Sequence, residues 1–600
     1  MTDFLQRLRE RKLGQWALAY AAGAWVLLQG LDLIGHQFDW PSGVLRGITV
    51  ALGVGFFATL VLAWYHGERG AQKVSGTELL IIALLLAIGG ALLWRFARTA
   101  QESAPTVITA KQVAKPAIIP AKSIAVLPFV DMSSGHDQEY FSDGMAEEIL
   151  NALAQVKDLK VAGRTSSFYF KGRNEDLRTI GQTLGVAYIL EGSVRKQGDK
   201  VRITAQLIHA TDDFHLWSES YDGDLKDVFA LQENIARAIT DKLKVVLEGE
   251  QKTRLVAVAT TNPEAYSLYL QATAIFDRRD NPRFPDAIAD LQQAITLDSN
   301  YARAHSRLAA LYNLQSSYND VDTSLTHEKV LEHARAALAL DPTLAEPHAA
   351  MGLSWGYLPD GHLKEREEYE QALRLDPDDV TSNFWYGLTL IITGYRERGI
   401  ALLDHALAID PMMPNVVRWR GIMYRYAGDP DHAEQFLKRA RSTGLSIADR
   451  ELALIAFDRG DAATAIRQWP DGARNLLHAL PPGDPEILAA GMFGDAVAKA
   501  RALAAVDAYL AKPHAQVPGQ IPVVLVILGQ PGRALELLRT TRLGDNTDFF
   551  ALLWSPAGKP MRVLPEFPVF LKEMGFIELW DTYGAPDDCR RVAPGNYLCE

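Results

Sequence analysis

The chain has 600 residues, which is too long for one domain and predicts three to five domains of about 100–200 residues each. Aliphatic, aromatic and cysteine residues make up 48% of the chain and charged residues 22%, which excludes a disordered protein. The formal net charge is −12, so the chain as a whole is not built to bind nucleic acid. Its two cysteines cannot complete a four-cysteine zinc site, and no CxxC motif occurs.

Charge and hydrophobicity divide the chain into two unlike parts. Residues 1–100 contain nine Lys or Arg and six Asp or Glu, whereas the remaining 500 contain 52 and 67. The first hundred residues also hold three apolar runs, at about 16–34, 47–65 and 79–97. Because a bilayer core of about 30 Å needs roughly 17–25 helical residues, these runs predict three transmembrane helices. We therefore expect a membrane anchor over residues 1–98 and a soluble, acidic body after it.

The flanking charges predict how this anchor is oriented. Six Lys or Arg lie before the first run and in the second loop, against three in the first loop and after the third run. The positive-inside rule then places the amino terminus in the cytoplasm and the domains after residue 98 in the periplasm of a bacterial inner membrane. Buried soluble helices, or a signal peptide for the first run, are the alternatives. Both alternatives fit poorly, because three apolar runs lie within about 80 residues and no small-residue cleavage site occurs.

After the anchor, the pattern predicts a linker and a small α/β domain. Residues 99–122 have three prolines and no regular period, as expected of an extended tether. Residues 123–250 then show the order β-α-β-α-β-β-β-α, which is typical of an α/β layer module. The expected strands are 123–129, 159–162, 187–195, 201–209 and 214–221, and the expected helices are 140–156, 176–184 and 225–247. Gly198 and Asp199 predict a hairpin between the third and fourth strands.

This module also resembles a known family. The segments SIAVLPFVDMSSGHDQEYFSDGMAEEIL, VAGRTSSFYFKGRNEDLRTIGQTLGVAYILEGSVRK and VRITAQLIHATDDFHLWSESYD resemble the TolB amino-terminal-like (FlgO-like) module of bacterial tetratricopeptide repeat proteins. RERK, AYAAGAW and AWYHGE resemble the membrane segment that often precedes it. The resemblance implies a non-catalytic interaction or sensory domain. Family members carry it beside winged-helix or class III cyclase domains, and this sequence shows the motifs of neither. Motif positions, which could be structural or could line a ligand pocket, are Arg164, Glu191, Gly192, Arg195 and Trp217.

Residues 263–545 contain a repeated pattern. The motif A-L-x-L-D-P begins at Ala294, Ala337, Ala372 and Ala406, and Ala440 continues the series. The last two intervals are 34 residues, the period of tetratricopeptide repeats. Small residues where the second helix crosses the first, and turn glycines at Gly394, Gly428, Gly460 and Gly529, agree with this. We expect an all-α solenoid with four good repeats up to about residue 445 and one or two degenerate repeats after it.

The first helix of each repeat is expected to line a concave groove that binds a protein or peptide. A solvated polar face is the alternative for any one of these positions. Matching the repeat pattern places seven residues on this face: Arg303, Ser306, Asn313, Asn415, Arg418, Arg425 and Tyr426.

The tail, residues 546–600, resembles the closing segment of such repeat proteins. Phe567, Phe570, Leu571 and Met574 have helical spacing, which predicts a capping helix over the last repeat. Cys589 and Cys599 lie ten residues apart and could form a disulfide in an oxidising compartment. Two unpaired thiols are the alternative. The distance and orientation of the two side chains decide whether the disulfide forms.

Enzyme motifs give little support for catalysis. Residues 352–356 match GxSxG, but they lie within a repeat helix and not between a strand and a helix. No phosphate-binding loop, HExxH, GxGxxG or EF-hand pattern occurs, and we expect no cofactor and no metal.

The sequence therefore favours a membrane-anchored, non-enzymatic scaffold that binds a protein partner and no nucleic acid; homo-oligomer formation remains open. The alternative is a signalling receptor or adaptor, related to proteins linked to cyclases or transcription regulators, that lacks its own output domain. An unrecognised enzyme in the α/β module is the third reading.

Overall fold

The structure is a computed structural model that forms two compact units, residues 1–117 and 118–600. It describes residues 119–600 except 174, 246–258, 319–322, 359, 475, 478, 514–516, 542–545 and 600, together with residues 20, 24, 25, 52 and 56. Apart from these five positions, the three predicted membrane spans lie outside the described residues. In the first unit, the Tyr20 hydroxyl donates to the Leu52 carbonyl oxygen at 3.0 Å. No helix formed by the described residues is both long enough and apolar enough to cross a bilayer.

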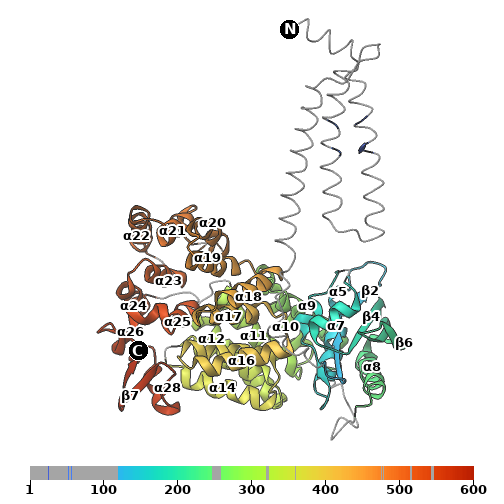
Figure 1. The fold of residues 1–600 in the computed structure, drawn as a ribbon. Coiled ribbons are helices and arrows are strands. Elements are labelled where there is room, and N and C mark those ends of the chain that lie inside the picture. The colour runs from blue at the N-terminus through green and yellow to red at the C-terminus, as the bar shows by residue number, and fades with distance from the viewer. Residues whose placement is uncertain are drawn as a thin grey trace, which may run out of the picture. The chain divides into compact units, whose positions relative to one another are not determined.

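The second unit begins with the predicted α/β module, drawn from blue to green in Figure 1. Its sheet has the strand order β3-β1-β4-β5-β6, and β2 pairs with β4 beside this path. The strands are β1 (Ser123–Val126), β2 (Val130–Asp131), β3 (Lys160–Val161), β4 (Tyr188–Gln197), β5 (Lys200–His209) and β6 (Phe214–Asp224). β1, β2 and β3 are parallel to their partners, whereas β4, β5 and β6 form an antiparallel meander. Gly198, with φ of +58°, makes the predicted hairpin turn between β4 and β5.

Helices cover both faces of this sheet. α5 (Glu139–Ala154) and α8 (Val228–Lys242) share a hydrophobic core with β4 and β5, whereas α7 (Leu177–Leu184) packs on the opposite face. The Asp176 carboxylate caps α7 by accepting the Thr179 N–H, and Gly185 ends it with φ of +66°. Two elements were not predicted from the sequence, β2 and the five-residue helix α6 (Arg164–Phe168). Both are too short to show a hydrophobic period.

The repeat region forms eight helix pairs among the described residues. They are α9 (Pro263–Asp277) with α10 (Phe284–Leu297), α11 (Ala302–Tyr318) with α12 (Thr323–Leu340), α13 (Glu346–Gly356) with α14 (His362–Leu375), α15 (Val380–Ile392) with α16 (Arg396–Ile409), α17 (Pro414–Tyr426) with α18 (Pro430–Ser442), α19 (Ala448–Asp458) with α20 (Ala462–Ala473), α21 (Asp484–Phe493) with α22 (Ala496–Leu510), and α23 (Gln520–Ile527) with α24 (Pro531–Thr540). The expected repeat count was therefore too low: five pairs precede residue 445 and three follow it. The later pairs lack the A-L-x-L-D-P motif, so the sequence period under-counted them.

The glycines predicted from the repeat pattern have the expected roles. Gly394, Gly428, Gly460 and Gly529 follow the first helix of their pairs with φ between +71° and +93°. A side chain in place of Gly387 would place its Cβ 3.1 Å from the Gly399 carbonyl oxygen on the second helix. Close helix crossing therefore requires a small residue there, as the sequence predicted.

The tail is more elaborate than the single capping helix that we expected. It contains α25 (Thr547–Leu553), α26 (Lys559–Arg562), α27 (Phe567–Glu573), α28 (Phe576–Tyr583) and a hairpin of β7 (Cys589–Ala593) and β8 (Asn596–Cys599). Gly575, with φ of +74°, separates α27 from α28. Phe549, Phe570, Phe576 and Trp580 are all buried in one hydrophobic core shared with the later repeats.

Candidate functional site

The module and the first repeats are joined by a common hydrophobic core. α5 of the module packs against α9, so Phe141 and Met145 lie in the same cluster as Tyr266 and Leu270. Figure 1 shows α5 and α9 side by side. A Cβ at Gly144 would lie 2.6 Å from the Leu270 side chain, so the glycine permits this close approach. The module is therefore packed directly against the repeats through this shared core.

Three of the predicted groove residues, on α11, have partners within the chain. The Arg303 guanidinium pairs with the Glu148 carboxylate of the module at 2.6 Å. The Ser306 hydroxyl donates to Glu346 at 2.5 Å, and the Asn313 amide donates to the Ala350 carbonyl oxygen at 2.7 Å. Ser306 and Asn313 are therefore buried against α13 of the next helix pair, and Arg303 binds the module.

The other four groove residues lie on α17. Arg418 is buried and pairs with Glu451 at 2.6 Å and with Asp548 of the tail at 2.8 Å. Arg425 pairs with Asp458 of α19 at 2.8 Å. Asn415, Arg425 and Tyr426 remain partly exposed. The partly exposed residues of the predicted groove therefore lie at the two ends of α17, Asn415 at its start and Arg425 and Tyr426 at its end.

The ion cluster around Asp548 joins the tail to the repeats. Its carboxylate bridges Arg418, at 2.8 Å, and Arg450, at 2.9 Å, while the Gln520 amide donates to it at 2.8 Å. Burial alone would raise the pKa of Asp548, but the two guanidinium groups outweigh burial and hold the pKa well below its usual range. The charged form of Asp548 is therefore part of the folded state.

A second buried ion cluster lies between the module and the repeats. Arg164 of α6 pairs with Glu147 at 2.7 Å and with Asp277 at 3.0 Å, and Arg307 pairs with Asp277 at 3.5 Å and with Glu346 at 3.1 Å. Three carboxylates thus face two guanidinium groups. Burial raises the pKa of Glu147 to about 7 against the attraction of Arg164, and the neighbouring Asp277 charge adds to the rise.

The short helix α6 binds a repeat directly. The Thr165 and Ser166 N–H groups donate to the Asp410 carboxylate at 3.1 and 2.8 Å, and the Ser166 hydroxyl donates to it as well. The Gly163 N–H donates to the Ile409 carbonyl oxygen at 2.9 Å. Nothing in the sequence indicates that Asp410 differs from the aspartates of the other repeats, because its local motif is the same.

The family-motif positions of the module have separate roles. Arg164 belongs to the buried ion cluster, and a Cβ at Gly192 would lie 2.7 Å from the Phe129 ring. The Trp217 indole donates to Glu219 at 3.1 Å, and the Arg195 Nε donates to the Met132 carbonyl oxygen at 3.3 Å. Burial raises the pKa of Glu191, which faces His215. The five residues do not converge on one pocket.

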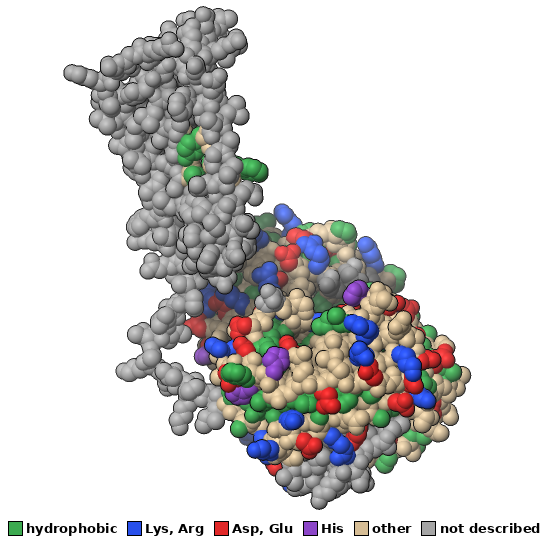
Figure 2. Space-filling model, turned by 90° about the vertical axis from the view of Figure 1, so that its right-hand side faces the viewer, with side chains coloured by type: hydrophobic (Ala, Val, Ile, Leu, Met, Phe, Trp, Pro, Cys, Tyr) green, Lys and Arg blue, Asp and Glu red, His purple; other side chains and the backbone are tan. Residues whose placement is uncertain are grey.

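The face that carries the module shows no patch of a single charge. In Figure 2, Lys and Arg side chains alternate with Asp and Glu over the described residues. Within the module, Arg202 pairs with Asp222 at 2.6 Å and Lys200 with Asp224 at 2.6 Å. A nucleic-acid interface needs a basic patch, and this face does not offer one.

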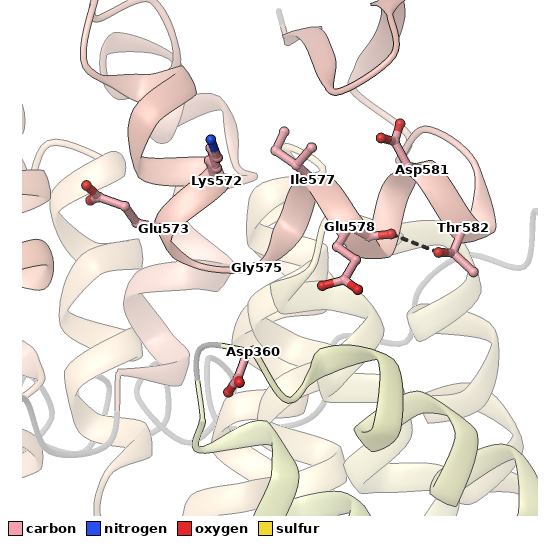
Figure 3. A pocket seen from close by; sticks show the side chains of 8 residues that line it. All are labelled: Asp360, Lys572, Glu573, Gly575, Ile577, Glu578, Asp581 and Thr582. Carbon is pink, nitrogen blue, oxygen red and sulfur yellow. Dashed lines mark hydrogen bonds between the residues drawn. The ribbon is translucent and has the colours of Figure 1, made fainter.

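An open pocket lies between α27 and α28 of the tail and Asp360, which precedes α14 of the repeats (Figure 3). It has a volume of about 530 Å³, and its lining includes Lys572, Glu573, Glu578 and Asp581. Arg539 pairs with Glu573 at 2.5 Å and Arg591 with Asp581 at 3.0 Å, so much of the negative charge is already compensated. Within the described residues, no cluster of three or more His, Cys, Asp or Glu could hold a metal ion.

The GxSxG segment lies in α13, as its helical context predicted. Ser354 is buried, and its hydroxyl is 2.8 Å from the His327 Nδ1 atom. This serine–histidine contact was not anticipated. Both side chains are buried among the repeat helices.

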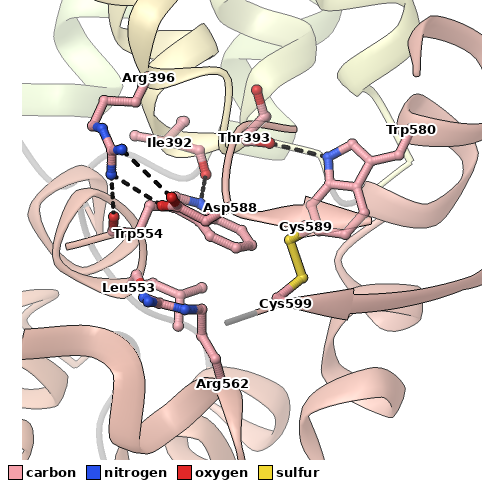
Figure 4. The surroundings of a disulfide bond; sticks show 10 residues. All are labelled: Ile392, Thr393, Arg396, Leu553, Trp554, Arg562, Trp580, Asp588, Cys589 and Cys599. Atoms are coloured by element: carbon pink, nitrogen blue, oxygen red, sulfur yellow. Dashed lines mark hydrogen bonds and ion pairs between the residues drawn. A yellow bond between two sulfur atoms is a disulfide. The ribbon is translucent and has the colours of Figure 1, made fainter. Parts of the chain in front are cut away.

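Cys589 and Cys599 form a disulfide that closes the β7–β8 hairpin (Figure 4). They are direct cross-strand partners in the hairpin. Cys599 and Tyr597 are buried, and the Tyr597 ring lies 5.1 Å from that of Trp580. The disulfide therefore joins β7 to β8, and the buried Tyr597 and Cys599 side chains attach this hairpin to the core of the tail.

Replacing both Cys589 and Cys599 with serine should loosen this hairpin. Closing a loop of this length contributes about 2–3 kcal/mol to the free energy of unfolding. We expect hydrogen exchange over residues 589–599 to accelerate accordingly, and a reductant should have the same effect on the unmodified chain. Equal protection in the reduced and oxidised chains would show that strand pairing and Tyr597 hold the hairpin unaided.

Comparison with known proteins gives partial matches. Residues 120–238 match the family described as HilA/YgeH-like transcriptional regulator, second domain. The protein named Putative adenylate cyclase 3 of Rhizobium meliloti (strain 1021) is 37% identical over 245 residues, which cover 40% of this chain and 42% of that protein. The Vi polysaccharide export protein VexE of Salmonella typhi is 28% identical over 156 residues, 25% of this chain and 24% of that protein. The matches thus span less than half of either relative.

Among solved structures, a thermophilic tetratricopeptide repeat protein of Thermus thermophilus is similar. It is 16% identical with a TM-score of 0.26, over 30% of this chain and 91% of that chain. The assignment of the repeats here rests on the helix pairs of this chain and their spacing.

Proposed function

We propose that the chain is a membrane-anchored, non-enzymatic scaffold that presents its α/β module and its repeats to a protein partner in the periplasm. The observation that carries this proposal is the stack of helix pairs over residues 263–540, built onto the module through a common core. A helix pair cannot bury its apolar face alone, and stacked pairs create a continuous surface suited to binding peptides or proteins.

We expect the partner at the partly exposed residues of α17, of which Asn415 lies at the start of the helix. A photoreactive amino acid at Asn415, introduced into the full chain in cells, should crosslink to a specific protein. The same amino acid at Lys438, on the second helix of the same pair and 66% exposed at its side chain, is the matched control. If Asn415 gives no crosslink that Lys438 lacks, the proposed use of this surface is wrong.

The periplasmic location is proposed from the Lys and Arg distribution of residues 1–100. The bond between Cys589 and Cys599 supports it, because disulfides persist in oxidising compartments. A reporter fused after Glu600 tests this location. Alkaline phosphatase activity is expected, whereas fluorescence of a cytoplasmic reporter would place the body of the chain on the other side.

A second candidate is a signalling adaptor that passes a signal to a separate output protein. The identity of 37% to Putative adenylate cyclase 3, and the match of residues 120–238 to a domain of transcriptional regulators, favour it. On this reading the TolB-like module would be the sensor. Deletion of the gene should then change the cyclic nucleotide level or the transcription controlled by a neighbouring regulator. No change in either would leave the scaffold as the better proposal.

A further inference from the structure

The contact between Asp410 and α6 differs from the contacts of the same aspartate in the preceding repeats. In those repeats the motif aspartate accepts a hydrogen bond from the backbone N–H two residues later. These bonds are Asn300 N to Asp298 at 3.0 Å, Thr343 N to Asp341 at 3.0 Å and Asp378 N to Asp376 at 3.1 Å. In the fourth motif, the Met412 N–H instead donates to the Ser166 hydroxyl at 2.7 Å. Asp410 is turned towards the module.

This exchange of partners leaves both arrangements of Asp410 fully bonded. With the module bound, Asp410 accepts from Thr165 and Ser166, while Ser166 accepts from Met412. With the module released, Asp410 can accept from Met412, as its counterparts do from the equivalent N–H groups. The Asp410 carboxylate therefore has hydrogen-bond donors in both states. This matters because a buried polar group destabilises the fold mainly when it lacks a partner. The contact therefore has two well-defined states.

We propose that Asp410 and α6 form a latch that holds the α/β module against the middle of the repeats, and that acid closes the latch while alkali loosens it. The module is attached to the repeats in three ways. α5 and α9 share an apolar core, and buried ion pairs join Arg164 to Asp277 and Glu148 to Arg303. The third attachment, at Asp410, consists of hydrogen bonds to the five-residue helix α6. Opening at Asp410 exposes less apolar surface than separating α5 from α9 would, and Arg164 can keep its ion pair with Asp277 when only the hydrogen bonds of Thr165 and Ser166 break.

The charges around the latch give the expected dependence on pH. Asp410 is 2% exposed, and no ion pair involves it among the described residues. The groups that face it are the Thr165 and Ser166 N–H groups and the Ser166 hydroxyl, whereas the neighbouring Arg164 is directed to Glu147 and Asp277. Burial raises the pKa of Asp410 against these hydrogen bonds.

The direction in which pH shifts the closing of the latch follows from proton uptake. A carboxylate with a higher pKa in the closed state binds more protons there, so closure is favoured as pH falls and weakened as pH rises through that pKa. The rise in the pKa of Glu147 to about 7 acts in the same direction. Each unit by which closure raises a pKa changes the closing equilibrium by up to about tenfold.

Gly163 provides a variant that should hold the latch open. Its φ of −60° suits alanine, but a Cβ there would lie 2.5 Å from the Asp410 Cβ. Gly163→Ala should therefore displace Asp410 without straining the backbone of residue 163. Asp410→Asn keeps the size of the side chain and removes its titration. Asp341→Asn is the matched control, because Asp341 has the same motif position and bonds its own Thr343.

Hydrogen exchange of the full chain at pH 5 and pH 8, corrected for the intrinsic rates, tests the latch. In the unmodified chain and in Asp341→Asn, segments 163–170 and 409–413 should exchange several-fold faster at pH 8, up to about tenfold for each pKa unit. Gly163→Ala should exchange fast at both pH values, and in Asp410→Asn the dependence on pH should shrink. Glu147→Gln should retain part of it.

Three outcomes would overturn the proposal. The first is equal protection of the unmodified chain at pH 5 and pH 8. The second is full protection in Gly163→Ala. The third is an unchanged dependence on pH in Asp410→Asn together with its loss in Glu147→Gln, which would assign the proton to the neighbouring ion cluster. The unmodified chain and Gly163→Ala answer the question even if Asp410→Asn does not fold.

Discussion

Replacing Trp580 with alanine should detach the end of the chain from the repeats. Its side chain is 0% exposed, and its indole donates to the Thr393 carbonyl oxygen at 3.0 Å. Its ring lies 5.7 Å from that of Trp554 and 5.9 Å from that of Phe576. Truncating a buried tryptophan costs about 3–5 kcal/mol, so hydrogen exchange over residues 567–599 should accelerate by two orders of magnitude or more.

Two further variants serve as an intermediate change and a control for this prediction. Trp580→Phe keeps most of the buried ring but leaves the Thr393 carbonyl without its donor, which should cost about 1–3 kcal/mol. Val569→Ala, at a side chain 48% exposed on α27, should have little effect. If Trp580→Ala leaves the exchange of α28 and the hairpin unchanged, the tail does not depend on this residue.

Replacing Arg418 with methionine should disrupt the contact of the tail with α17. It would leave the Glu451 and Asp548 carboxylates buried with Arg450 as their remaining cation. Removing one partner of a buried ion pair costs about 3–5 kcal/mol, because the other charge stays buried. We expect faster hydrogen exchange in α25 and increased cleavage near it by protease.

The same variant should change the response of the tail to acid. The pKa of Asp548 is lowered in the folded state, so its contribution to stability is present above its usual value of 3.8 and is lost as pH falls below it. Arg418→Met removes part of this lowering, so α25 should begin to open at a higher pH. Arg420→Met, on the same helix and paired with the more exposed Asp404, should cost about 1 kcal/mol or less. Identical acid responses of Arg418→Met and the unmodified chain would contradict this account.

The module contact and the Asp548 cluster are therefore expected to respond to pH in opposite directions. Burial raises the pKa values of Glu147 and Asp410 at the module contact, so we expect acid to stabilise it. At Asp548, two guanidinium groups bind one carboxylate directly, so attraction dominates and acid destabilises the contact. Measuring both segments in one titration provides an internal control for general effects of pH on the chain.

Local patterns allowed much of the architecture to be predicted. Period-two and helical patterns identified the main strands and helices of the module, and the turn glycines at Gly394, Gly428, Gly460 and Gly529 have the expected positive φ. The prediction failed where elements were short or the repeat motif was lost. Examples are α6, the hairpin at residues 589–599 and the number of helix pairs after residue 445, where one or two were expected and three are present.

The groove residues show where local patterns are insufficient. Repeat position placed Arg303 and Arg418 on the first helices of their pairs, but it did not indicate that Glu148 and Asp548 of the same chain would bind them. The use of the groove residues as a partner-binding face stays a prediction, best tested at Asn415 of α17. The partners are 155 and 130 residues away along the chain, beyond the reach of any periodic signal.

The sequence by itself determined the classes of structure, because hydrophobic period, turn glycines and repeat length act over a few residues or one repeat. Only the tertiary structure decided which charged side chains meet, since that depends on how distant segments pack. Asp410 illustrates this difference most clearly. Its motif is the one that Asp341 and Asp376 share, yet the approach of α6 gives it different partners and a different electrostatic environment.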